Sequence, residues 1–535
     1  MITSFFKIPT ILLSVFILGL SFANPARSQN SRTPGMNYPE TQPHTQPSSP
    51  RGIDPLFILN LIDGLSRSGG SETKVDLSPD LAEIRGRISR LYILLARQYL
   101  LQNQIPAACS ALDKAHIAEL EAYLQKRLRS RQPDSTDCYG SQLQKISQLT
   151  GSPTALIYAT TSKDGLDLIF VPPSGSSAPI SSSFSSYISS SMSSLQKSDE
   201  EKSDKTKQSS TQPSRQVVNR ATTAEMDAVI QEFRSNLRDA SSYDFLPQAQ
   251  QLYDWIVRPM EPELEKAHIK TLVFVMNGNL RIIPPAALHD GKQFLIEKYA
   301  IASVPTPQLA DLQRSDRSRN LQVLAMGLSE SVQGWQPLPA TKIEVEAIAA
   351  QVLSGSSFLN SGFTIDNLQS QVSDKKYGIV HLATHAKFVG QSPNESFVQF
   401  WNDRLTINRL ASLQLSMNIL TLSACETAVG ENLGLAGVAV SAGAETVVAS
   451  LWSVSDAGTA PLMISFYSQL RQAPSKAIAL QQAQLQLLRG EIKIEKGKII
   501  GIKGFPAIPF LDSANGVDLK HPYFWSSFTM IGNWF

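Results

Sequence analysis

Five short apolar runs, separated by helical patterns, constrain the fold of the C-terminal half of this chain more than any other feature. The apolar runs cover residues 272–276, 321–326, 377–383, 417–423 and 446–452. Helical patterns occupy residues 364–372, 432–444, 458–472 and 475–490. Strands that alternate with helices form a largely parallel sheet covered on both faces. We therefore expect an α/β sandwich with its reactive groups at the carboxyl ends of the strands.

One of the helices in this half also carries a start signal. Thr341 is followed three residues later by Glu344, which is the spacing of a capping box. Apolar residues then recur on one face. The pattern predicts a helix that begins near Thr341 with these two side chains bonded to its first turn.

Two of the apolar runs end in small-residue turns that hold chemically reactive side chains. The run at 377–383 leads into Thr384, His385 and Ala386, and the run at 417–423 leads into Ala424 and Cys425. If both runs are parallel strands of one sheet, the imidazole and the thiol emerge at the same edge. A thiol with a pKa of about 8.5 needs a nearby base to become nucleophilic at neutral pH. Backbone N–H groups at the turns would stabilise an oxyanion.

These two segments resemble the CHAT family, a branch of the caspase-like cysteine peptidase clan that includes the separases. The matching motifs are HLATHA around His385 and SACET around Cys425. The resemblance continues through 272–290, 434–459 and 521–534, and covers about 154–535 without the Ser-rich insertion. It implies a caspase-like three-layer sandwich preceded by a small helical domain. His385 and Cys425 would form the catalytic dyad, and amides near Ala386 and Cys425 the oxyanion hole. Ala386 replaces the glycine of caspases and narrows the site.

Other residues near these motifs have open roles. Asp456 would line a substrate pocket for a basic side chain, as in arginine-preferring relatives, or cap the helix that starts near 458. Glu426 is structural or lines the pocket. His381 precedes His385 by four residues, but HLATH has Leu where the HExxH zinc motif has Glu, so we interpret His381 as structural. We expect no metal site.

The N-terminus has the features of an export signal. Lys7 is the only charge before Arg27, and the apolar stretch at 8–23 is shorter than the roughly 20 residues that span a bilayer. Small residues at Ser21 and Ala23, and at Ala26 and Ser28, suit a signal peptidase. We expect a signal peptide at 1–28, a disordered linker at 29–77, and a periplasmic or secreted protein without a membrane span after cleavage.

A helical hairpin domain is predicted at 78–150, from two apolar patterns at 81–103 and 105–128. It is a candidate regulatory or partner-binding module. Cys109 and Cys138 lie in this region, and the chain has 3 cysteines in all. In an oxidising compartment these two would form a disulfide or remain independent thiols, and Cys425 would be the odd thiol.

The remaining domain is expected at 151–535. It opens with two strands at 154–172 around a turn at Lys163–Gly165 and is interrupted at 173–215 by a flexible Ser-rich, then charged, insertion. The net charge of +2 gives no reason to expect nucleic-acid binding, and there is no P-loop pattern.

The sequence therefore predicts an exported cysteine endopeptidase that cleaves proteins or peptides through an acyl-enzyme, with no cofactor. The alternative is a catalytically silent scaffold or binding protein with the same fold. A weaker third hypothesis is transpeptidation on the same dyad.

Overall fold

The structure is a computed structural model of the 535-residue chain. It describes residues 79–128, 135–175, 212–312, 320–373, 376–389, 395–412, 417–424, 437, 440, 443–452, 456–502 and 518–535. The predicted signal peptide, the linker at 29–77 and most of the Ser-rich insertion lie outside these residues. Within the described part of the chain, no helix is long and apolar enough to cross a bilayer.

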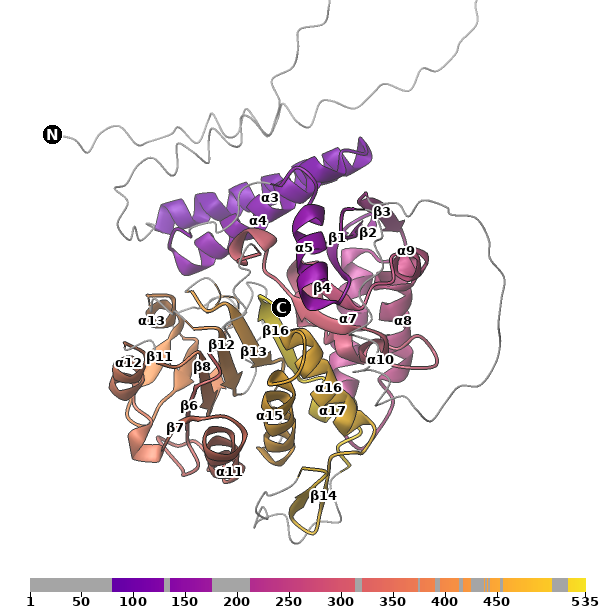
Figure 1. Ribbon diagram of the computed structural model, residues 1–535. Coiled ribbons are helices and arrows are strands. Elements are labelled where there is room, and N and C mark those ends of the chain that lie inside the picture. Colours follow the sequence, from indigo (N-terminus) through magenta and orange to yellow (C-terminus); the bar gives the residue numbers. More distant parts are fainter. Residues whose placement is uncertain are drawn as a thin grey trace, which may run out of the picture. The chain divides into compact units, whose positions relative to one another are not determined.

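A sheet of 11 strands forms the framework, in the order β3-β2-β1-β4-β5-β16-β13-β12-β8-β6-β7 (Figure 1). Its strands are β1 (Thr154–Ser162), β2 (Gly165–Val171), β3 (Ser214–Val218), β4 (Thr271–Met276), β5 (Ala300–Ser303), β6 (Val323–Gly327), β7 (Gly355–Leu359), β8 (Ile379–Ala383), β12 (Ile419–Ser423), β13 (Thr446–Ser450) and β16 (Phe528–Gly532). All five predicted apolar runs are strands of this sheet, which confirms the predicted α/β class.

The sheet consists of two halves that meet at β16. The N-terminal half contains β1, β4 and β5, which are parallel to one another. At its edge β2 pairs antiparallel with β1, and β3 pairs antiparallel with β2. The C-terminal half contains β7, β6, β8, β12 and β13, all parallel. β16 runs antiparallel to β13 over five residue pairs but pairs with β5 only at Ile531 and Ser303. The seam at β5 is therefore the weakest pairing in the sheet.

Helices cover both faces of the C-terminal half because the chain reverses direction within it. The chain passes from β6 outward to β7 through α11 (Ala340–Ala347), then back past β6 to β8 through α12 (Ile365–Ser373). Right-handed crossovers in opposite directions put their helices on opposite faces. The other helices after β3 are α7 (Thr223–Leu237), α8 (Leu246–Ile256), α9 (Glu261–Lys266), α10 (Leu295–Lys298), α13 (Ile407–Ser412), α15 (Asp456–Leu470), α16 (Lys476–Leu488) and α17 (Pro522–Trp525).

The N-terminal helical region contains α3 (Pro79–Leu101), α4 (Ile105–Leu124) and an additional α5 (Gly140–Thr150). α3 and α4 are the predicted hairpin. Their buried side chains belong to the same continuous core as those of the sheet. Asp113 of α4 accepts hydrogen bonds from Tyr139, Tyr158 and Thr306, of which Tyr158 lies on β1. The hairpin is therefore packed into the sheet's own core, and its predicted partner-binding role stays a prediction.

Two predicted boundaries differ from the structure. The insertion was expected to extend to 215, but β3 begins at Ser214, where it pairs with Phe170 of β2. The capping box at Thr341 is wrong. α11 begins at Ala340 without a side-chain cap of its own, and Glu344 is turned into the core instead. A small second sheet, β9 (Ala386–Lys387), β10 (Phe397–Gln399) and β11 (Arg404–Thr406), and a hairpin of β14 (Lys493–Glu495) and β15 (Lys498–Ile500) complete the fold.

Candidate active site

The two predicted catalytic segments end side by side at one edge of the sheet. β8 and β12 are parallel neighbours, with Ile379 opposite Ile419 and Ala383 opposite Ser423. One residue further on, Thr384 N–H donates to the Ser423 carbonyl at 3.0 Å. His385 follows Thr384, and the described chain continues to Ala424 on the other strand. Cys425 and Glu426 lie outside the described residues.

His385 is held in one orientation by a loop from a third strand. Its Nε2 lies 2.8 Å from the Gln336 carbonyl oxygen, and its ring stacks on Trp335 with centroids 4.7 Å apart and planes 20° apart. A carbonyl oxygen accepts only, so Nε2 must carry the proton of this hydrogen bond. In the neutral imidazole the basic lone pair is therefore on Nδ1.

Burial of the His385 ring lowers its pKa below the ordinary value of 6.5, because the charged form loses solvation. The hydrogen bond to Gln336 opposes this shift but is the smaller effect. The imidazole is thus neutral at neutral pH. A neutral histidine with a free lone pair is the form that can accept a proton from a thiol.

The loop that holds His385 is itself fastened to the catalytic edge. It leaves β6 at Gly327, and Leu328 N–H donates to the Ala383 carbonyl at the end of β8. A tight turn brings Trp335 N–H to the Val332 carbonyl at 2.8 Å, and Ser331 donates to the Trp335 carbonyl at 2.8 Å. These contacts present Trp335 and Gln336 to the imidazole.

Gln399, on β10, connects this loop to the histidine. Its backbone N–H donates to the His385 carbonyl at 2.8 Å, and its Oε1 accepts from Trp335 Nε1 at 3.2 Å. Its Nε2 donates to the Phe400 carbonyl at 2.6 Å. The side chain is fully buried, so each of these bonds is shielded from water. Trp335, Gln336 and Gln399 were not singled out from the sequence.

A buried polar network lies beneath the site, and Glu344 is part of it. Ser423 of β12 donates to Glu344 Oε1 at 3.1 Å, and His381 Nε2 lies 3.1 Å from the same oxygen, outside hydrogen-bond geometry. His381 Nδ1 lies 3.1 Å from the Tyr467 hydroxyl, which also bonds Thr421 at 2.7 Å. His381 is therefore a structural residue that joins β8 to α11 and α15. No group of metal-ligating side chains occurs among the described residues.

Asp456 makes a contact that the sequence did not predict. It is the first residue of α15, and its Oδ2 accepts the N–H of Ala340 at 2.7 Å, at the start of α11. It therefore caps a different helix from the one expected. Burial, with the nearby charge of Glu344, raises its pKa to about 7. Because α11 follows the loop with Gln336, this cap steadies the residues that hold His385.

The two cysteines of the N-terminal helical region form a disulfide. Cys109 of α4 and Cys138, just before α5, form a disulfide with Cα atoms 5.8 Å apart. α4 also contacts the segment after β9, where the ring of Tyr123 lies 6.4 Å from that of Phe388. Phe388 follows β9 directly, three residues after His385.

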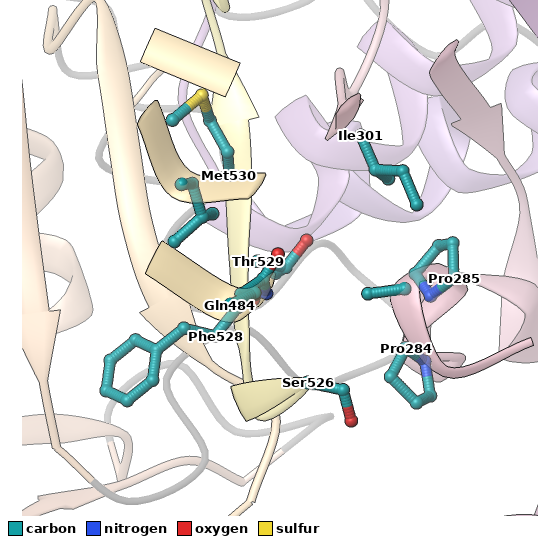
Figure 2. Close-up of a pocket in the computed structure, with 10 residues that line it drawn as sticks. Pro284, Pro285, Ile301, Gln484, Ser526, Phe528, Thr529 and Met530 are labelled. Carbon is teal, nitrogen blue, oxygen red and sulfur yellow. Dashed lines mark hydrogen bonds between the residues drawn. The ribbon is translucent and has the colours of Figure 1, made fainter. Parts of the chain in front are cut away.

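A small pocket lies away from these residues, where the two halves of the sheet meet. Figure 2 shows Pro284, Pro285 and Ile301 on one side of it and Gln484, Phe528 and Met530 on the other. Its volume is about 10 Å³. That is the room of roughly one water molecule, too little for a peptide side chain.

Comparison with known proteins supports the resemblance found in the sequence. The family model of the CHAT domain matches residues 246–533. No curated protein matches this chain in sequence. A Saccharomyces cerevisiae separase–securin complex is similar in structure at 10% identity and a TM-score of 0.42, with 89% of this chain and 37% of that chain covered. The Arg-specific cysteine proteinase gingipain R (RgpB) matches at 13% identity and a TM-score of 0.33, with 58% and 75% covered. A complex of the pro- and mature domains of Porphyromonas gingivalis RgpB matches at 11% identity and a TM-score of 0.34, with 58% and 76% covered.

Proposed function

Because the chain belongs to the CHAT domain family, we propose that it is a cysteine endopeptidase in which Cys425 is the nucleophile and His385 its base. The observation that carries this proposal is the state of His385. Its Nε2 is committed to the Gln336 carbonyl, and its Nδ1 has no partner among the described residues. The ring is thus oriented and neutral, with one basic nitrogen available.

The register of β8 and β12 supports the pairing of the two residues. Ala383 and Ser423 are direct neighbours, and His385 and Cys425 each follow two residues later. Strand neighbours lie about 4.8 Å apart, and each further residue moves the chain by at most 3.8 Å. The proposal requires that the two segments stay side by side beyond the strand ends, so that the thiol reaches the imidazole after a modest side-chain rotation.

In the proposed reaction, His385 Nδ1 accepts the proton of Cys425 and the thiolate attacks the carbonyl carbon of the scissile bond. The same nitrogen returns the proton to the leaving amine, which leaves an acyl-enzyme. His385 then removes a proton from water, and the resulting hydroxide releases the acyl group as the free acid. The proton finally returns to the thiol.

Ala386 N–H is suited to stabilise the oxyanion. Gln399 N–H bonds the His385 carbonyl, so the pair of His385 and Gln399 is hydrogen-bonded across β9 and β10. Ala386 pairs with Val398, the next position along. In an antiparallel ladder hydrogen-bonded pairs alternate with open ones, so the Ala386 N–H points away from β10. Removal of such a donor typically costs about 10²-fold or more in rate.

Labelling with an electrophilic peptide probe tests the dyad. We expect the probe to modify Cys425 in the wild type and to do so about 10²- to 10⁴-fold more slowly in His385→Ala. His289→Ala removes an imidazole from the connection between β4 and β5, on the other half of the protein, and is the matched control. Equal labelling of wild type and His385→Ala would refute the peptidase and favour the scaffold interpretation. A product with a new peptide bond, formed with an added amine, would favour transpeptidation.

We further propose that the protein is exported. The N-terminal pattern of a charge, an apolar stretch and small residues supports this, and so does the disulfide between Cys109 and Cys138, since disulfides persist in oxidising compartments. Mass spectrometry of the mature N-terminus from fractionated cells tests it. We expect a start after Ala23 or Ser28 in the extracytoplasmic fraction, and a retained Met1 in the cytoplasm would contradict it.

A further inference from the structure

The small sheet beside the site places three side chains in one row. Gln399 of β10 lies opposite Arg404 of β11 on one side, and on the other its N–H bonds the carbonyl of His385. Residues directly opposite one another on neighbouring strands point to the same face. The side chains of His385, Gln399 and Arg404 therefore share a face, and Trp335 packs on that face through the first two.

The guanidinium of Arg404 is held in place from two sides. It lies over the ring of Phe397 at 4.5 Å from the centroid, and its Nε donates to Gln399 Oε1 at 3.3 Å. Phe397 is buried and also contacts Trp335, with ring centroids 6.5 Å apart. The head group of an exposed arginine would otherwise be free to rotate, so these contacts reduce the entropy that it loses on binding a ligand.

The charge of Arg404 is not used within the described part of the protein. The neighbouring Asp403 accepts from Arg409 at 3.0 Å and from the Arg404 backbone N–H at 2.7 Å. No carboxylate of the described residues lies within ion-pair distance of the Arg404 guanidinium, and its side chain is exposed. Its two Nη groups remain open in the planar fork that matches a carboxylate.

We propose that Arg404 binds a carboxylate side chain, aspartate or glutamate, of the peptide substrate. This inference rests on the proposed peptidase function and adds a substrate class to it. Two strand spacings of about 4.8 Å separate the backbone of Arg404 from that of His385, roughly 10 Å in all. An extended peptide covers this distance in about three residues, so the acidic side chain lies a few residues from the scissile bond.

Pairs of electrophilic peptide probes test the proposal on the full chain. The two members of each pair differ only by Glu or Gln at one position, and the position is varied within four residues of the electrophile. We expect the wild type to label about three- to tenfold faster with Glu at one position. In Arg404→Gln this ratio falls to about one. A further probe carries Lys at this position, and we expect Arg404→Glu to label faster with it than with the Gln probe.

Arg409→Gln removes a neighbouring positive charge that is already paired with Asp403, and should keep the wild-type preference. Thermal melting of each variant shows that it is folded. A wild type without a Glu preference at any position, or a preference that survives in Arg404→Gln, overturns the role of Arg404 while Cys425 labelling still supports the peptidase. A wild type in which neither member of any pair labels Cys425 overturns both.

Discussion

The two halves of the sheet are built from similar strands, but their central strands differ in what they bury. In the N-terminal half, β4 is buried along its whole length and its only polar residue is Thr271 at the start. In the C-terminal half, β8 and β12 bury His381, Thr421 and Ser423. These polar groups bond Glu344 and Tyr467 from two helices on one face of the sheet.

This difference indicates where the fold buries hydrogen-bonded polar side chains in place of apolar ones. Burial of an unpaired polar group costs free energy, so a network of this kind persists only where its members satisfy one another. The network lies directly under the strand ends that carry His385 and lead to Cys425. We infer that it fixes the relative positions of β8, β12 and α11, while the buried polar contacts of the N-terminal half, such as those of Asp113, join the helical hairpin to the sheet.

Loss of Glu344 should have the largest effect on stability. Glu344→Ala leaves the Ser423 hydroxyl without its acceptor inside the core and removes the carboxylate that faces His381 at 3.1 Å, and we expect the free energy of unfolding to fall by about 3–5 kcal/mol. Urea unfolding measures it. Glu346→Ala, on the exposed side of the same helix, should stay within about 0.5 kcal/mol of the wild type. Equal losses in the two variants would show that the buried network does not contribute more to stability than an exposed side chain of the same helix.

Loss of the disulfide tests the N-terminal half. The bridge joins residues 29 positions apart. Closing a loop of this length raises the free energy of the unfolded chain, and so stabilises the fold, by about 3–4 kcal/mol. Cys109→Ser with Cys138→Ser should lower the midpoint of unfolding accordingly. At temperatures where this variant is folded, we expect Cys425 to be labelled at a rate close to that of the wild type. Loss of labelling in the folded variant would mean that the two halves are coupled, through contacts such as that of Tyr123 with Phe388.

Exposure of the His385 imidazole should have the smallest effect, confined to the pH dependence of Cys425 labelling. Burial lowers the pKa of His385, and the base must be neutral to act, so labelling should decline with falling pH only below 6.5. Trp335→Ala admits water to the ring, raises this pKa toward 6.5 and moves the acid limb of the labelling profile to higher pH. Trp401→Ala, whose ring does not stack on His385, is the control. An unmoved limb in Trp335→Ala would show that the stacking does not shield the ring.

Much of the fold follows from the sequence because the strands of a buried parallel sheet are short continuous apolar runs. The runs at 272–276 and 446–452 correspond to β4 and β13 within a few residues. The edge strands were harder to find. β7 has the sequence GSSFL and is partly exposed, so it lacks the apolar run that marks a central strand.

The site could be predicted only where its residues carry a reactive group. His385 stood out through its imidazole and its motif. Gln336 contributes a backbone carbonyl, which every residue possesses, and Gln399 acts through an ordinary amide. Glu344 was misassigned because the local capping pattern with Thr341 is indistinguishable, in sequence, from a carboxylate that a distant strand requires. Cys425 and Glu426 keep their predicted roles as predictions.

The pairing of β16 with both halves has a consequence for how the protein is made. β16 follows every other strand of the described residues in the chain, yet it lies between β13 and β5. As the chain emerges N-terminus first in the compartment where it folds, the strands of each half appear before the strand that connects them, and each half exposes an apolar, unpaired edge in the meantime. Such edges favour mispairing in slowly folding sheets. The protein is therefore most exposed to mispairing in the interval between the emergence of β13 and that of β16.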